Sequence, residues 1–130
     1  MRVLFLLAAI FAAVPAFAAL PPQYYEEARA NAESVLVVRI ERTAGLAFRR
    51  GYGDCHVFGV VEAVERGSRY SAGDAVRISV PCRRPNAQIP ASGVQYEEVA
   101  ELRRSRWGRA WLNVNGELAL YQYDILASYP

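Results

Sequence analysis

The chain has 130 residues, a formal net charge of +2, 53% apolar residues and 12% aromatic residues. This composition excludes a disordered chain, collagen, a coiled coil and a multi-pass membrane protein. Because the charge is close to neutral, nothing draws the whole protein to nucleic acid or to an anionic membrane, and no nucleic-acid partner is expected.

Residues 1–18 have the three parts of a secretory signal peptide. Arg2 is followed by an apolar run, Val3–Val14, and by the small-residue exit Ala16-Phe17-Ala18. The competing interpretation is a retained anchor, but the run has 12 residues and crossing a bilayer takes about 20. The sequence therefore predicts cleavage after residue 18, no membrane span after cleavage, and a periplasmic or secreted protein.

Removal of the first 18 of 130 residues would leave 112, which is the size of one small domain over 19–130. The only cysteines, Cys55 and Cys82, both lie in this part of the chain. An even number of cysteines in a small exported domain predicts a disulfide, worth roughly 3–4 kcal/mol for a loop of this length. The alternative is a metal or redox pair, although this spacing matches neither a zinc site nor a CxxC sequence.

The first predicted elements are a helix and a strand. Pro21 and Pro22 open a helical stretch over Gln23–Glu33, in which apolar residues recur at helical spacing. Residues 34–43 then have the composition of a strand, with Leu36, Val38 and Ile40 on one face and Arg39 and Glu41 on the other. Three glycines in residues 44–53 predict a loop.

Two further strands are expected between residues 54 and 80. Residues 54–66 form a long strand whose mixed apolar phase around Gly59 predicts a bulge or bend. After a polar turn, residues 76–80 alternate again and predict a third strand. Residues 83–93 hold no regular element.

A helix of about three turns is predicted next. Ser92 and Gln95 match a capping box, and the acidic pair Glu97-Glu98 falls in the first turn. Arginines occupy the last turn and Gly108 provides the stop.

A hairpin follows. Residues 110–114 alternate up to Asn115-Gly116, and Leu118 and Leu120 continue the apolar face beyond it. Asn-Gly between two alternating runs predicts a two-residue type I′ turn.

Two tyrosines, Tyr121 and Tyr123, fall on the face opposite these leucines. If the leucines are inside, the tyrosines form an exposed stripe of the kind found at interfaces. We expect instead that they pack under the N-terminal helix with Tyr24 and Tyr25.

The order helix, three strands, helix, two strands predicts a mainly β fold. It is the order of a small five-stranded OB-like Greek-key barrel with an N-terminal helix and a helix between strands 3 and 4. The expected disulfide would join the start of the second strand to the end of the third. These two points are neighbours in an antiparallel pair, so the disulfide and the barrel agree.

Three segments of alternating apolar residues, interrupted by a basic-glycine turn, resemble the netrin-like (tissue-inhibitor-of-metalloproteinases-like) group of OB-folds. The segments are Ala30–Ile40, Val60–Gly67 and Gly73–Ile78, and the resemblance covers residues 28–82. It implies the OB fold. Inhibitors of that group chelate the protease zinc through a mature N-terminal cysteine, whereas the mature start expected here is Ala19-Leu20-Pro21, so the resemblance does not carry that mechanism over.

No residues for catalysis are visible. His56 is the only histidine, and its interpretation as a general base or ligand competes with an ordinary place at a strand end. The acidic pairs Glu26-Glu27 and Glu97-Glu98 suit first turns of helices, and no nucleophile elbow, phosphate loop or zinc-protease sequence is present. We therefore expect no enzyme, no metal and no cofactor.

Basic and aromatic residues concentrate around the second predicted helix. They form a candidate patch for an anionic ligand or an envelope protein, consisting of Arg83, Arg84, Arg103, Arg104, Trp107 and Trp111. The alternative is a solvated helix end whose arginines pair with Glu98 and Glu101. The sequence thus favours an exported, non-catalytic binding or interaction module of the cell envelope. The alternative function is an inhibitor of a protease or other exported hydrolase, acting through an edge or a loop such as 83–93.

Overall fold

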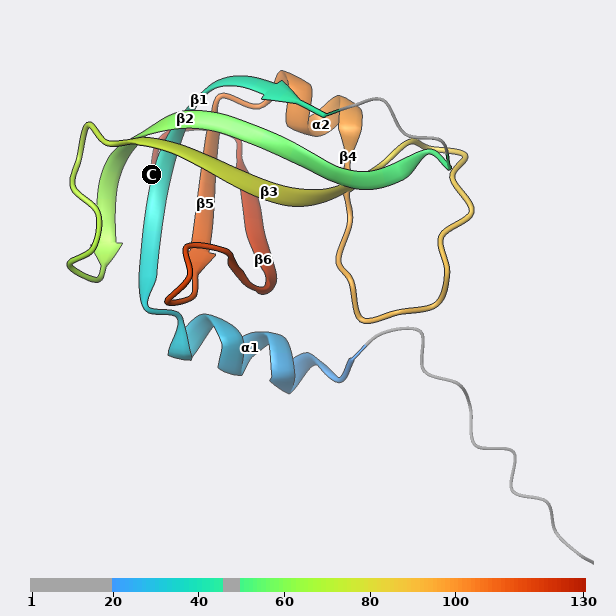
Figure 1. The fold of residues 1–130 in the computed structure, drawn as a ribbon, viewed down its shortest axis with the longest axis horizontal. Coiled ribbons are helices and arrows are strands. Elements are labelled where there is room, and N and C mark those ends of the chain that lie inside the picture. The colour runs from blue at the N-terminus through green and yellow to red at the C-terminus, as the bar shows by residue number, and fades with distance from the viewer. Residues whose placement is uncertain (1–19, 46–49) are drawn as a thin grey trace, which may run out of the picture.

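A computed structural model describes residues 20–45 and 50–130; the predicted signal peptide and the middle of the predicted 44–53 loop lie outside these residues. The described chain is mainly β, with six strands and two helices (Figure 1). In chain order the elements are α1 (Pro22–Asn31), β1 (Ser34–Ala44), β2 (Tyr52–Arg66), β3 (Ala75–Arg83), β4 (Glu97–Glu98), α2 (Val99–Arg104), β5 (Trp107–Leu112) and β6 (Leu118–Leu126).

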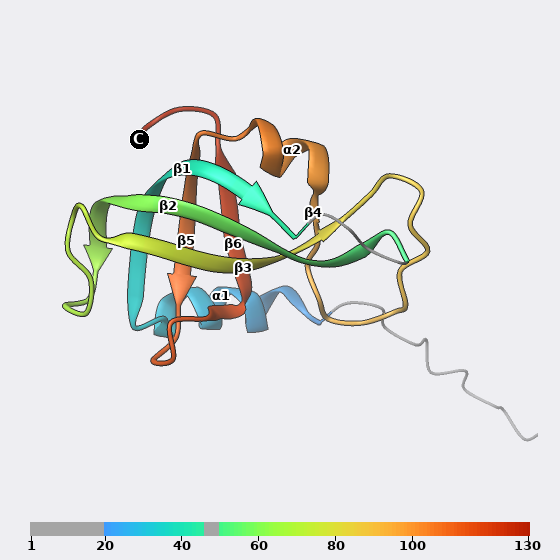
Figure 2. The same cartoon turned by 45° about the horizontal axis from the view of Figure 1, so that its top comes forward.

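The strands form one curled sheet in the order β4-β3-β2-β1-β5-β6. All neighbours are antiparallel except the short β3–β4 pair. In Figures 1 and 2, β1 first runs beside β5 and then turns to run with β2, so β2 and β3 cross in front of β5 and β6. The curl brings β3 into contact with β6, yet no ladder joins them within the described chain.

The turn in β1 coincides with the irregularity expected at Gly59. Ile40 pairs with Gly59 and Arg42 with Phe58, so the extra residue is Glu41 in β1 rather than a residue of β2. A Cβ at Gly59 would lie 2.4 Å from the carbonyl oxygen of Arg39, so only glycine permits this close approach of the strands.

The core fills the concave side of the sheet. In β2 every second residue from Cys55 to Val61 is buried, which is the alternation of a strand with one covered face. The predicted disulfide is confirmed: Cys55 and Cys82 are joined in the core, and neither is exposed. The largest other core side chains are Leu36, Ile78, Leu102, Leu112 and Tyr123.

The expectation of five strands is wrong, because β4 is a sixth. The backbones of Glu97 and Glu98 pair with Cys82 and Arg83 at the edge of β3, so this acidic pair precedes α2, with Glu98 as its N-cap, and does not lie in its first turn. The predicted capping box also fails, since the Ser92 hydroxyl accepts a hydrogen bond from the Val94 N–H (3.2 Å) within a turn. The three-turn helix therefore shrinks to α2.

The β5–β6 hairpin is present, but the type I′ turn is wrong. Gly116 has φ 78°, whereas Asn115 is not left-handed, and the Gly116 N–H donates to the Asn113 carbonyl (3.0 Å). The loop thus has three residues, 114–116, with the glycine in the left-handed position. The side-chain oxygen of Asn113 accepts from the N–H groups of Asn115 and Glu117 and so holds the turn.

The predicted placement of the tyrosines is also wrong. Leu120 and Tyr121 have φ values of 44° and 62°, a left-handed conformation that non-glycine residues rarely adopt. This pair breaks the alternation of β6. As a result Tyr123 is buried in the core while Tyr121 is exposed. The two tyrosines therefore do not pack together under α1.

Helix α1 lies at the lower end of the sheet, below β5 and β6 (Figure 1). Its C-terminal carbonyls are covered by Arg66, whose guanidinium donates to the carbonyls of Arg29 and Ala32. Of the helices that the structure describes, none is both long and apolar enough to cross a membrane.

Candidate functional site

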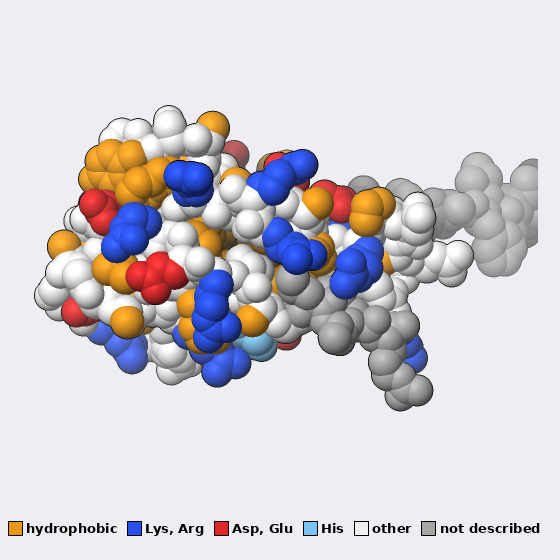
Figure 3. Space-filling model, turned by 90° about the horizontal axis from the view of Figure 1, so that it is seen from above, with side chains coloured by type: hydrophobic (Ala, Val, Ile, Leu, Met, Phe, Trp, Pro, Cys, Tyr) orange, Lys and Arg blue, Asp and Glu red, His pale blue; other side chains and the backbone are white. Residues whose placement is uncertain are grey.

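The six residues of the predicted patch do not share one surface. Arg83 lines a depression beside the 89–96 segment, Arg104 and Trp107 line a second, and Trp111 lines a third. Arg84 and Arg103 are exposed. Figure 3 shows basic side chains spread over the molecule rather than gathered together. Only Arg104 and Trp107 are brought into the same depression.

Trp111 attaches α1 to the sheet. Its side chain is only 8% exposed, and the Arg29 guanidinium lies 3.8 Å from the centroid of its ring. Arg29 also donates to the side chain of Gln122 (2.7 Å) and forms an ion pair with Asp124 (2.9 Å). Trp111 therefore packs between α1 and the sheet and has little surface open to a ligand.

Arg83 and Arg104 are both engaged with acidic residues. Arg83 lies 3.3 Å from a Glu98 carboxylate oxygen, and Arg104 pairs with Glu101 one turn earlier in α2. These are the acidic partners that the alternative of a solvated helix end expects. The pairs are partly exposed and each adds little to stability.

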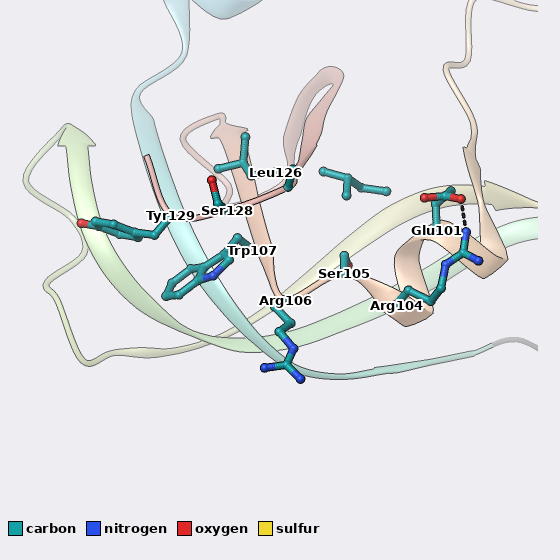
Figure 4. Close-up of a pocket in the computed structure, with 10 residues that line it drawn as sticks. Glu101, Arg104, Ser105, Arg106, Trp107, Leu126, Ser128 and Tyr129 are labelled. Atoms are coloured by element: carbon teal, nitrogen blue, oxygen red, sulfur yellow. Dashed lines mark hydrogen bonds and ion pairs between the residues drawn. The ribbon is translucent and has the colours of Figure 1, made fainter.

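Trp107 lies in a depression that we name the Trp107 pocket (Figure 4). Its volume is about 390 Å³, at the small end of ligand pockets. Its lining residues come from α2 and the two residues after it, from β5 and β6, and from the C-terminal segment. The lining residues are Glu101, Arg104, Ser105, Arg106, Trp107, Ile125, Leu126, Ala127, Ser128 and Tyr129.

Two aromatic rings form one side of this pocket. The centroids of Trp107 and Tyr129 are 5.1 Å apart with an interplanar angle of 61°, an edge-on packing. Tyr129 is 50% exposed. An aromatic or aliphatic group entering the pocket therefore meets ring surface without moving the backbone.

The backbone beneath the pocket is fixed. The Ser105 hydroxyl donates to the Leu102 carbonyl (2.6 Å) and closes the end of α2. The Arg106 carbonyl accepts from the Ile40 N–H (2.8 Å), which joins this segment to β1. The Arg106 side chain is exposed, and in Figure 4 its guanidinium points away from the rings of Trp107 and Tyr129.

The charge of the pocket is positive. Arg104 is compensated by Glu101, whereas no carboxylate among residues 20–45 and 50–130 lies within ion-pair distance of Arg106. The pocket combines an apolar floor with a cation at its rim, and its lining contains neither histidine nor cysteine. This arrangement suits recognition of an apolar group that carries an acid.

His56 lies elsewhere, on the convex face of β2. Its Nδ1 is 3.1 Å from the hydroxyl oxygen of Ser79, the residue opposite it in β3. In the described part of the chain, no group of three or more histidine, cysteine or acidic side chains is placed to hold a metal ion.

Two ionisable groups near β4 are perturbed. Burial, and next the charge of Asp124, raises the pKa of Glu97 above its ordinary value. Burial, and next the charge of Glu97, raises the pKa of Tyr123 well above its usual range. The Tyr123 hydroxyl has no hydrogen-bond partner within the described residues, although it is buried. Tyr123 is buried and Glu97 is partly buried, and neither lines the Trp107 pocket.

Sequence reasoning missed Tyr129, since no local pattern indicates that the end of the chain crosses over β5. Comparisons of the chain with protein-family models, with curated proteins and with solved structures find no match. The case for a function therefore comes from the geometry described above.

Proposed function

We propose that this protein is an exported, non-catalytic interaction module that docks an acidic, apolar segment of a partner protein in the Trp107 pocket. One observation carries the proposal: Trp107, Tyr129 and Arg106 line the same depression, with the two rings packed edge-on and the arginine exposed beside them. Tryptophan, tyrosine and arginine are the residue types that dominate binding energy at protein interfaces.

The compartment and fold belong to the proposal. A disulfide in the core favours an oxidising compartment, the periplasm or the exterior, in keeping with the expected signal peptide. We assign the half-barrel to the OB type, because β1 pairs with both β2 and β5 and β6 then faces β3. Its assignment to the netrin-like group rests on the sequence resemblance over residues 28–82. The short β4 is an addition to that pattern.

The pocket suggests how the partner is held. An aromatic or branched aliphatic side chain would pack between the rings and Leu126, while a neighbouring carboxylate would accept two hydrogen bonds from the Arg106 guanidinium. Truncation of such an anchor costs about 2 kcal/mol or more, which is roughly 30-fold in affinity.

The test is in-cell crosslinking of the tagged protein, followed by capture and mass spectrometry. The expected result is one dominant partner, lost with Trp107→Ala and with Arg106→Glu. Arg103→Glu is the matched control, because it reverses an exposed charge on α2 outside the pocket. Capture that survives both pocket variants, or that is lost equally with the control, would contradict the proposal.

The second candidate function, inhibition of an exported hydrolase, rests on residues 84–96. This segment is held at both ends: the Arg84 N–H donates to the Gly51 carbonyl (2.7 Å), and the Tyr25 hydroxyl donates to the Gly93 carbonyl (2.7 Å). A loop fixed in advance loses little entropy on binding. An inhibitor would lose potency with Ile89→Glu and keep it with Trp107→Ala, the reverse of the pattern expected for the interaction module.

A further inference from the structure

A second surface lies on the convex side of β1, β2 and β3, away from the Trp107 pocket. Arg42, Phe58 and Arg77 stand side by side on adjacent strands, since Arg42 pairs with Phe58 and Phe58 with Arg77 in register. The guanidinium carbons of Arg42 and Arg77 lie 3.8 Å and 5.7 Å from the centroid of the Phe58 ring. We name these three residues the arginine–phenylalanine row.

The two arginines of the row are not neutralised. Neither has a carboxylate within ion-pair distance among the residues that the structure describes. Both are exposed. A guanidinium stacked on a ring keeps its N–H donors at the edge of its plane, so these donors still face solvent.

Hydrogen-bonding groups continue along β2 and β3 from the row. The next pair on the same face is His56 and Ser79, and the pair after it contains Asp54, an acid that ends the positive surface. In Figure 3, blue basic side chains and an orange apolar side chain lie next to the pale blue histidine. Because neighbouring strands are about 4.8 Å apart, the backbones of the two arginines are roughly 10 Å apart, the span of about two sugar rings.

We propose that the arginine–phenylalanine row binds a glycan that carries sulfate or phosphate groups. Arginine forks hydrogen-bond tetrahedral oxyanions in pairs, and two forks held 3.8 Å and 5.7 Å from one ring centroid can bind anionic groups on the same sugar or on successive sugars. Nucleic acid is disfavoured because single strands need an open aromatic face for base stacking, and Arg42 covers the ring of Phe58. A membrane surface is disfavoured because no uncovered large apolar side chain of the row is left to insert.

The test measures binding of the purified protein to dextran sulfate by calorimetry, with neutral dextran as the reference. Dextran sulfate should bind and neutral dextran should not. Arg42→Gln and Arg77→Gln should each weaken binding about 3- to 10-fold and lower the dependence of log Kd on log salt by about one. Arg103→Gln removes the same charge from α2 and should change Kd by less than about twofold. Trp107→Ala should leave this binding intact, which separates it from the proposed function.

Several outcomes would overturn the proposal. One is that dextran sulfate does not bind; another is that Arg103→Gln loses as much affinity as the row variants. A third is binding to a single-stranded oligonucleotide or to phosphatidylglycerol vesicles that is about tenfold tighter than to dextran sulfate, because the row would then serve that other ligand. Near-ultraviolet circular dichroism of each variant confirms that the fold is retained.

Discussion

The two faces of the curled sheet are covered by different chemistry. On the concave face, aliphatic side chains, the disulfide and Tyr123 pack against one another. On the convex face, arginines lie over the apolar groups: Arg29 covers Trp111 and Arg42 covers Phe58. The two faces differ in cooperativity. A core residue packs against several elements at once, whereas Arg42 covers one ring and Arg29 covers one ring and pairs with one acid.

The ion pair between Arg109 and Glu65 illustrates the convex face. It joins β5 to β2 (2.6 Å) and therefore passes over β1, where Val37, the partner of Arg109 in register, is buried. The side-chain hydrogen bond with Glu65 raises the pKa of Arg109 above its ordinary value. We expect changes on the concave face to lower global stability and changes on the convex face to act locally.

The largest effect expected is loss of the disulfide. Cys55→Ala with Cys82→Ala should lower the free energy of unfolding by about 3.5 kcal/mol, because a closed loop of 27 residues no longer restricts the unfolded chain. Chemical denaturation measures this change. A reductant should destabilise the wild type similarly and leave the double variant unchanged; a loss below about 1 kcal/mol would contradict the expectation.

Gly108→Ala tests the packing of the concave face. The added Cβ would lie 2.0 Å from the Tyr123 hydroxyl oxygen, so the ring must move within a close-packed core. We expect a loss of about 2–3 kcal/mol in the free energy of unfolding. Adding Tyr123→Leu should recover part of it, and a double variant no better than the single one would show that the collision is not the cause.

Arg29→Gln tests the cover over Trp111. Loss of the stacking and of the partly exposed ion pair with Asp124 should cost about 1–2 kcal/mol and release α1 from the sheet. Trp111 fluorescence and cleavage of α1 by a protease measure this local change. Arg103→Gln is the matched control; if the two variants behave alike, the arginine cover has no special role.

The smallest effect expected is that of Tyr123→Phe, which removes a buried hydroxyl without a described partner and should stabilise the protein by about 1 kcal/mol. Since burial raises the pKa of Tyr123 above the ordinary 10.0, the unfolded chain loses this proton first. Stability should therefore be complete below pH 10 and fall as the pH rises beyond it. Unfolding measured on either side of pH 10 should show a smaller slope for the variant.

The concave face could largely be predicted from the sequence. Alternation in β2 and around Ile78 in β3 and the pairing of Cys55 with Cys82 are local or nearly local signals, and the structure confirms them. In β1 the residues from Ser34 to Val38 are all buried, because that part of the strand is covered on both faces. It could not be predicted which residues of β6 face the core. Leu120 and Tyr121 have left-handed backbone conformations that exchange the two faces of the strand, and no glycine in the sequence indicates this. Likewise, the free edge of β3 draws Glu97 and Glu98 out of the expected helix.

The contacts on the convex face could hardly be predicted from the sequence. That Trp107 meets Tyr129, or that Arg42 and Arg77 flank Phe58, depends on strand register and on the path of the C-terminal segment. Neither follows from the spacing of residues along one strand. The predicted patch gathered arginines that are close in sequence, whereas the structure distributes them over separate depressions.

The unpaired edge of β3 has a consequence for behaviour at high concentration. An open sheet edge can recruit strands from other molecules and begin aggregation. Here Pro81 removes one backbone donor, the exposed charge of Arg77 lies near the middle of the strand, and β4 covers only its end. We expect these features, together with the contact between β3 and β6, to keep this edge from pairing with a strand of another molecule.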